Sequence, residues 1–294
     1  LADVPCLRGR AEDVDLDEPV DCIVSVFTGN LLLGEDLLPT LFRARDRFLA
    51  PGGRLFPDRG RIQVAACSAP DLYADEIACW DSAPHGLDLS AARAFAANMP
   101  RGVVAADEGV ELLSEVGTAA EIDFHTAREA RCDGRFELQV RQAGACHGLL
   151  GWFDARIGSQ WLSTAPHAER THWRPVFLPF SEPLRLEEGE RLAVRLHRPE
   201  FGDWSWTTRA RAGMRRQSEF AARPVARSEL AALAPGHRPV PGRRAAQVRA
   251  VLDLMDGDRT TDDIVEALRG QDSGLFRADG LERRVREILR AYGE

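Results

Sequence analysis

The amino-acid sequence predicts an α/β segment, then a longer antiparallel β region, then a small helical domain. Three observations lead to this fold class. Near the N-terminus an apolar run is followed by a stretch with helical spacing. From about residue 58 the apolar residues alternate in short segments that are separated by Gly, Pro or Asp. Beyond a Pro-rich stretch at 235–242, apolar residues again recur at helical spacing.

The first segment, residues 1–57, predicts a strand, a helix and a second strand. The run 21–26 (DCIVSV) is continuously apolar, as expected of a strand covered on both faces. Residues 36–49 have helical spacing, and the Pro-Gly-Gly at 51–53 ends that helix. Residues 54–56 then return as a strand. A strand–helix–strand unit of this length implies a parallel crossover.

Residues 58–222 predict an antiparallel barrel or sandwich. One interruption, residues 70–99, has partly helical spacing and is too apolar for a solvated loop. We therefore expect it to be an arm that buries its apolar face against a partner. The predicted strands contain RIQVAAC, EIDFHTA, RFELQVRQ, CHGLLGWFDARI, RLAVRLHR and DWSWTTRA.

The C-terminal part consists of a predicted linker at 223–242 and a helical domain at 243–294. Two short amphipathic helices are expected on either side of 256–258, and a third over 281–292. Thr260 or Thr261 is suited to cap the second helix, because a threonine hydroxyl can accept a hydrogen bond from a free amide of the first turn.

Composition excludes several classes of function. The net charge is −8, and all 38 basic residues are arginine. A chain this acidic is not expected to bind nucleic acid and suits a basic peptide or protein better. No apolar run approaches the roughly 20 residues of a membrane span. The six cysteines are far apart with no metal-ligand spacing, so we expect no metal site, and buried thiols in the cytoplasm.

Four blocks of sequence resemble the protein arginine methyltransferases. They occur in that family's order and at roughly its spacing, across residues 6–220. LAPGGRLFPDR and THW are the specific parts, and the earlier blocks alone would be weak. The blocks are RGRAEDVDL (8–16), VDCIVSVFTG (20–29), ARDRFLAPGGRLFPDR (44–59) and STAPHAERTHW (163–173).

The resemblance implies an S-adenosylmethionine-dependent methyltransferase. It implies a Rossmann-like half that binds the cofactor and a β-barrel half with a helical dimerisation arm, so that residues 70–99 would form a homodimer. In the family a target guanidinium lies between two glutamates of a hairpin loop, and a Thr-His-Trp loop closes the site. Two carboxylates can hold the forked donors of a guanidinium while one nitrogen faces the methyl group.

Carried over residue by residue, the resemblance makes Glu35 and His172 catalytic and Asn30 and Trp173 substrate-binding. Glu35 matches the second glutamate, but Val26 stands where the first would be. Asn30 replaces a family aromatic. Outside this context Glu35 would be an ordinary acid at a helix start, and His172 a structural histidine.

The cofactor residues implied by the resemblance are Ala11, Glu12, Leu37 and Thr40. Glu12 matches an acid that meets the adenine amino group, and Leu37 and Thr40 match positions beside the cofactor. The family's glycine-rich loop and the acid that contacts the ribose are not found in the 294 residues. We expect them before Leu1, in a longer protein.

We therefore expect a methyltransferase that acts on a peptide or protein. Because of Val26, the acceptor need not be arginine: removing one carboxylate from a buried cationic site costs several kcal/mol. The alternative is a catalytically inactive relative that serves as a peptide-binding or scaffold protein.

A second resemblance concerns the C-terminal helices. LDLMDGDRTTDDIVEAL followed by a helix is similar to the winged-helix domains of the PqqD type, which bind the leader peptides of modified peptides. The strands that precede those helices in that family are not evident here. A structural or oligomerising appendage and a DNA-binding helix-turn-helix are the other interpretations. The 11 Arg and 11 acids of residues 237–294 give no net charge, which disfavours DNA.

Overall fold

The computed structural model describes residues 6–83, 86–105, 108–270, 274–277 and 279–293. It divides into two compact units, Leu1–Pro224 and Val225–Glu294, and each is described here by itself. Parts of the predicted arm (84–85) and of the predicted helical domain (271–273, 278 and 294) lie outside the described residues. No helix among the described residues is long and apolar enough to cross a membrane.

The first unit begins with the predicted strand–helix–strand unit. Strand β1 (Val20–Val24) pairs in parallel with β2 (Leu49–Phe56), and helix α1 (Leu38–Phe48) connects them. Pro39 lies in the first turn of α1, where it is tolerated because early amides have no intrahelical acceptor. Leu41 on this helix is buried in the main core. The parallel pairing inferred from the sequence is confirmed.

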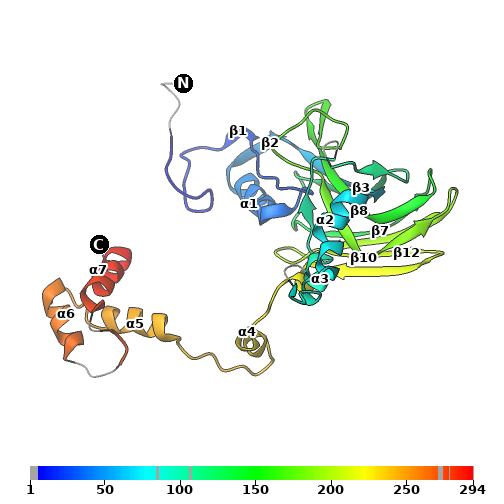
Figure 1. Cartoon of the computed structure of the whole chain (residues 1–294). Helices are drawn as coiled ribbons and strands as arrows, with labels where there is room; N and C mark the ends of the chain where they lie inside the picture. The colour runs from blue at the N-terminus through cyan, green and yellow to red at the C-terminus, as the bar shows by residue number, and fades with distance from the viewer. Residues whose placement is uncertain (1–5, 84–85, 106–107, 271–273, 278, 294) are drawn as a thin grey trace. The chain divides into compact units, whose positions relative to one another are not determined.

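Two antiparallel sheets follow (Figure 1). Within the described residues one sheet has seven strands and the other has four, in the order β13-β12-β11-β7. The seven-stranded sheet contains β3 (Arg59–Ser68), β4 (Arg101–Gly102), β5 (Glu111–Leu112), β6 (Gly117–Asp123), β8 (Gly144–Ile157), β9 (Gln160–Ser163) and β10 (Val176–Leu186). The four-stranded sheet contains β7 (Cys132–Gln139), β11 (Arg191–Arg198), β12 (Ser205–Ala210) and β13 (Gly213–Ser218), and a 3-10 turn η4 (Glu219–Ala222) follows it.

The prediction of a closed β-barrel is wrong, because the described strands form two sheets and do not close into a ring. Pro179 and Pro183 lie in β10, where a continuous ladder to β13 would need amide donors that proline lacks. Side chains bridge the two sheets instead: the Trp206 Nε1 donates to the Pro179 carbonyl at 2.8 Å. Trp204 and Trp206 are buried in the shared core, as the alternation of this strand predicts.

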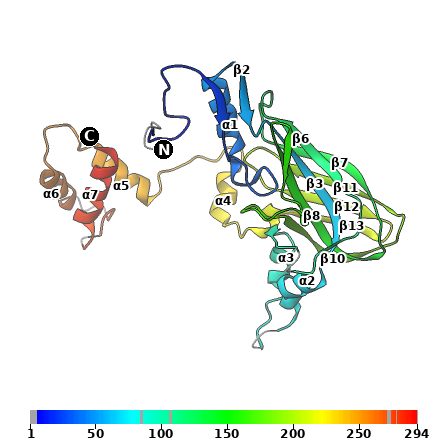
Figure 2. The same ribbon diagram turned by 90° about the horizontal axis from the view of Figure 1, so that it is seen from above.

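The predicted arm contains helix α2 (Pro70–Glu76), a 3-10 turn η2 (Ala78–Asp81) and helix α3 (Ala91–Ala96). Figure 2 shows it projecting from one end of the sheets. His147 on β8 is buried at its base and accepts a hydrogen bond from the Ala69 amide through Nδ1 at 3.1 Å. Burial lowers the pKa of His147, so the ring stays neutral and can accept this bond.

The second unit is helical, with α4 (Arg227–Ala232), α5 (Arg243–Leu252), α6 (Thr261–Arg269) and α7 (Leu281–Tyr292). Thr260 caps α6, and the Asp263 amide donates to its hydroxyl at 3.2 Å. Its described residues contain no strand, and the winged-helix, PqqD-type prediction is not confirmed.

Candidate functional site

Residues 28–36, here the leucine loop, run from β1 towards α1 and insert apolar side chains between the sheets. Leu31, Leu32 and Leu33 are only 1%, 0% and 2% exposed. Space for the first two comes from glycines: a Cβ on Gly151 would lie 2.5 Å from Leu31, and one on Gly60 would lie 2.6 Å from Leu32. The loop is thus an integral part of the core, and its position is set by packing.

The end of the leucine loop has a strained backbone. Leu31, Leu32, Glu35 and Asp36 all have positive φ, at 54°, 65°, 66° and 53°. Non-glycine residues adopt this region only when the surroundings hold them there. Part of the restraint is an ion pair, because the Arg198 Nη1 lies 2.8 Å from the Asp36 Oδ1 and the Arg198 side chain is 7% exposed.

Glu35 occupies the tip of this loop and is exposed to solvent. Among the described residues its carboxylate makes no hydrogen bond or ion pair, so both oxygens can accept donors from a ligand. Val26, which the sequence resemblance matches to the family's other glutamate, is 67% exposed. The structure therefore has one free carboxylate at Glu35 and one exposed apolar side chain at Val26, the two positions that the sequence resemblance matches to a pair of acids.

Residues 163–175, here the Trp173 loop, are joined to the leucine loop by two hydrogen bonds. The Trp173 Nε1 donates to the Thr28 carbonyl at 2.8 Å, and the Arg174 amide donates to the Asn30 Oδ1 at 2.9 Å. The Trp173 ring also meets Phe153 edge-on at 5.5 Å. His172 is exposed and packs on Trp173 with ring centres 3.9 Å apart.

The predicted cofactor residues lie in a second cluster. The Thr40 hydroxyl, on α1, donates to the Glu12 Oε1 at 2.6 Å. This hydrogen bond holds the pKa of Glu12 below its usual value. Leu37 is the residue before α1, and Ala11 lines an apolar hollow that also contains Val26. Glu12 thus stays ionised: its Oε1 accepts from Thr40, and its Oε2 lies 3.8 Å from the Nε of the exposed Arg10.

The structure brings the predicted residues together in two groups. Asn30 and Trp173 are connected through the two loops, and Glu12 is bonded to Thr40. Among the described residues no hydrogen bond or ion pair joins His172 to Glu35. Arg198 was not singled out from the sequence, because an arginine on a strand carries no local signal that it contacts a distant loop.

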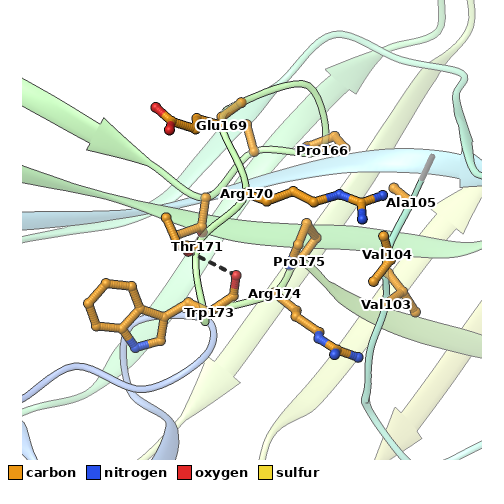
Figure 3. A pocket seen from close by; sticks show the side chains of 13 residues that line it. Val103, Val104, Ala105, Pro166, Glu169, Arg170, Thr171, Trp173, Arg174 and Pro175 are labelled. Atoms are coloured by element: carbon orange, nitrogen blue, oxygen red, sulfur yellow. Dashed lines mark hydrogen bonds between the residues drawn. The ribbon is translucent and has the colours of Figure 1, made fainter. Parts of the chain in front are cut away.

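A pocket of about 160 Å³ lies between the Trp173 loop and the segment of residues 103–105. The segment of residues 103–105 forms its opposite wall, and Figure 3 shows the side chains between the two segments. Within the loop, the Thr171 hydroxyl donates to the Trp173 carbonyl at 3.0 Å. The described pocket lining combines apolar residues with the arginines 170 and 174.

Comparison with known proteins identifies the same family as the sequence blocks. Residues 58–202 match the family described as the arginine methyltransferase oligomerization subdomain. The chain is 33% identical over 217 residues to a probable histone-arginine methyltransferase CARM1 of Oryza sativa, covering 69% of this chain and 41% of that protein. It is 31% identical to protein arginine N-methyltransferase 2 of Xenopus tropicalis, covering 65% of this chain and 46% of that protein. The chain thus spans about half the length of these curated relatives or less.

Solved structures agree. A Trypanosoma brucei PRMT1 enzyme-prozyme heterotetrameric complex with AdoHcy superposes with a TM-score of 0.64 at 25% identity, covering 72% of this chain and 71% of that one. Protein arginine methyltransferase 10 of Arabidopsis thaliana has the same fold, with a TM-score of 0.57 at 21% identity and coverage of 72% and 74%. The matches together show that this chain is similar to protein arginine methyltransferases, over the oligomerization subdomain at residues 58–202 and in its mixed α/β fold.

Proposed function

We propose that this protein takes part in S-adenosylmethionine-dependent methyl transfer to a peptide or protein. The observation that supports this most strongly is the union of two loops: the carboxylate of Glu35 is free on a rigid loop to which Trp173 is hydrogen-bonded. A loop that is strained and packed and yet presents an unpaired acid at Glu35 is suited to positioning a ligand. The Trypanosoma relative carries AdoHcy, the demethylated product of this cofactor.

The residues of this chain fit the adenine side of such a cofactor. Glu12 is ionised and can accept a hydrogen bond from an exocyclic amine, while Thr40 fixes its orientation. Residues 1–57 would then be the C-terminal part of the Rossmann-like half. The cofactor, when bound, supplies an electrophilic methyl group. The role of Glu35 is to hold the acceptor in line with it, and His172 and Trp173 close the site.

For the acceptor, we propose a neutral nitrogen, an oxygen or a carboxylate in place of arginine. A guanidinium held by Glu35 alone would keep several of its five N–H donors without a charged acceptor once the bound substrate excludes water, at a cost of several kcal/mol. A neutral nitrogen or an oxygen has fewer donors to satisfy and a carboxylate has none, so these acceptors avoid that cost. It would pack its apolar part against Val26, which is 67% exposed before binding.

Calorimetry with S-adenosylmethionine tests the cofactor part of this proposal, with the full-length product of the gene as the protein. We expect binding, and about tenfold weaker binding for Glu12→Gln, since a charge-assisted hydrogen bond is lost. Glu18→Gln is the matched control, because Glu18 is an exposed acid of the same segment. Absence of heat at millimolar cofactor would contradict the proposal.

Mass spectrometry of co-expressed candidate peptides tests the acceptor. We expect a gain of one methyl group at a residue other than arginine, and no product with Glu35→Gln. Dimethylarginine in the product would contradict the assignment made from Val26.

The alternative is an inactive relative that holds a peptide as a scaffold, and Val26 is the observation that favours it. Restoring the acid separates the two functions. The scaffold function is supported if the wild-type protein binds the cofactor but methylates no peptide, and if the Val26→Glu variant methylates arginine.

The arm at 70–99 is proposed to form a homodimer. Its described residues expose Leu87, Leu89, Phe95 and Met99 at 59%, 39%, 40% and 41%, which is unusual for a solvated surface. Light scattering should give a dimer that becomes a monomer with Phe95→Glu. An unchanged mass would contradict this role.

The C-terminal unit is proposed to recruit the substrate by binding a leader peptide, and the protein is proposed to work in the cytoplasm. Residues 225–294 should then bind the same peptide when expressed alone, since they form a compact unit with their own core. If deletion of this unit leaves the KM for the peptide unchanged, it is an appendage.

A further inference from the structure

We propose that the outer face of the four-stranded sheet binds a short acidic segment of a protein partner. The inference goes beyond the proposed methyl transfer and does not rest on it. The four strands lie side by side in the order β13-β12-β11-β7 (Figure 2). Along each strand, side chains alternate between the core and the surface. The outward side chains of these strands, here the basic face, include five arginines, which are Arg135, Arg191, Arg195, Arg209 and Arg216.

The charge of the basic face is opposite to that of the whole chain, whose net charge is −8. The outward side chains of the four strands include only two acids, Asp133 and Glu137, and each already has a partner. The Arg195 Nη2 lies 3.1 Å from the Asp133 Oδ1, and the Arg191 Nη1 lies 3.0 Å from the Glu137 Oε2. Three guanidinium groups are left without a carboxylate partner among the described residues, those of the exposed Arg135, Arg209 and Arg216.

Three of the arginines lie in one row across the sheet. Arg195 on β11 is paired directly with Arg135 on β7 and, on its other side, with Thr207 on β12. Thr207 in turn is paired with Arg216 on β13. Because neighbouring strands are about 4.8 Å apart, the row is about 14 Å long. Like charges directly opposite each other destabilise a strand pair, so the contact of Arg135 with Arg195 brings the fold no benefit, and a bound anion would relieve the repulsion.

A short acidic peptide segment fits this row. The forked donors of a guanidinium can hold a carboxylate through two hydrogen bonds. In an extended peptide, alternate side chains point the same way and are about 7 Å apart, so three alternate acids also span about 14 Å. The outward side chains of the four strands include no Phe, Tyr or Trp on which nucleic-acid bases could stack. A long polyanion would also extend beyond the row towards a chain of net charge −8, which repels it.

The basic face is separate from the candidate site. Arg198, at the end of β11, turns to the other side of the sheet, where its Nη1 lies 2.8 Å from the Asp36 Oδ1. The alternation of β11 thus places the leucine loop and the basic face on opposite sides of the four-stranded sheet. A partner on the basic face would leave Glu35 accessible, so the two sites can be tested separately.

Fluorescence anisotropy tests the inference, with the 294-residue protein and no cofactor. The probes carry an uncharged dye and are acetyl-Ala-Glu-Ala-Glu-Ala-Glu-Ala-amide, the same peptide with glutamines, and a single-stranded oligothymidylate of the same net charge. We expect the glutamate peptide to bind at least about tenfold more tightly than the glutamine peptide, and this preference to weaken with added salt. Arg135→Gln combined with Arg216→Gln should remove most of the preference. Lysine at both positions should retain part of it, because the charge stays and the fork is lost.

Arg128→Gln combined with Arg185→Gln is the matched control, since it changes the net charge equally. These two side chains are 76% and 86% exposed and lie outside the four strands. Equal binding of the two peptides would overturn the inference, as would a loss in the control as large as in the Arg135 and Arg216 variant. An oligothymidylate that binds as tightly as the glutamate peptide would assign the face to polyanions in general and overturn the peptide assignment. None of these readouts involves methyl transfer, so this result and the test of the proposed function stand or fall separately.

Discussion

The leucine loop and the Trp173 loop meet at the candidate site, yet they are held in opposite ways. The leucine loop is held by three buried side chains, those of Leu31, Leu32 and Leu33, and by the ion pair of Asp36 with Arg198. The Trp173 loop is held by contacts of partly exposed residues, which are two hydrogen bonds to the leucine loop and the ring contacts of Trp173. The first loop should therefore be a fixed platform for Glu35, and the second should open at a low free-energy cost.

The largest effect should come from the buried anchor. Leu32→Ala leaves a cavity between the sheets and should lower the free energy of unfolding by about 3–5 kcal/mol. Urea denaturation measures the loss. The matched control is Leu87→Ala, which removes the same atoms from a side chain that is 59% exposed and should change stability by less than about 0.5 kcal/mol. Equal effects of the two substitutions would show that the leucine loop is not a platform.

The ion pair should contribute the next largest effect. Arg198→Gln leaves Asp36 without its partner and should cost about 2–3 kcal/mol, less than a fully buried pair because the Asp36 side chain is 31% exposed. Arg195→Gln is the control on the same strand, because its pair with Asp133 is about half exposed and should contribute less than about 1 kcal/mol. A double-mutant cycle with Asp36→Asn gives the coupling energy, and a value near zero would remove the ion pair from the explanation of the strained backbone.

The same contrast explains how much of the molecule the sequence could predict. Local signals were sufficient for α7, predicted at 281–292 and found there. They also narrowed the cap of α6 to Thr260 or Thr261, and the structure has it at Thr260. Periodicity also predicted the parallel β1–β2 pair. The open seam between the sheets could not be predicted, because it depends on which distant strands exchange backbone hydrogen bonds. The resemblance implied a closed barrel, and the effect of Pro179 on the ladder is visible only once its neighbours are known.

The candidate site divides in the same way. The sequence resemblance singled out Glu35, but it made no prediction about the three leucines before it, which the structure places in the core. Their burial depends on Gly60 and Gly151, two glycines on separate strands. Arg198 had no signal at all, since pairing of an arginine with a distant group leaves no local pattern.

The hydrogen bond from Trp173 to Thr28 should contribute less to the free energy of unfolding than the burial of Leu32 or the Asp36–Arg198 ion pair. Trp173→Phe removes the donor to the Thr28 carbonyl while keeping an aromatic ring, and should cost about 1 kcal/mol. Trp161→Phe controls for the loss of ring size, since its indole makes no hydrogen bond among the described residues. Hydrogen exchange should become faster in residues 163–175 and stay unchanged in residues 28–36. Faster exchange in both loops would show that they open as one unit.

The smallest effect concerns the contact between Glu12 and Thr40, and it is measured as a pKa. The Thr40 hydroxyl stabilises the ionised carboxylate, so the pKa of Glu12 should lie below 4.5 in the native protein and rise towards 4.5 in Thr40→Val. Because the native pKa is the lower one, this contact stabilises the fold above pH 4.5, and the contribution disappears as the pH falls through the native pKa. An NMR titration of the Glu12 side chain reads both values. If the pKa of Glu12 is the same with and without the threonine hydroxyl, Thr40 does not orient this acid, and the adenine side of the proposed cofactor site loses its fixed acceptor.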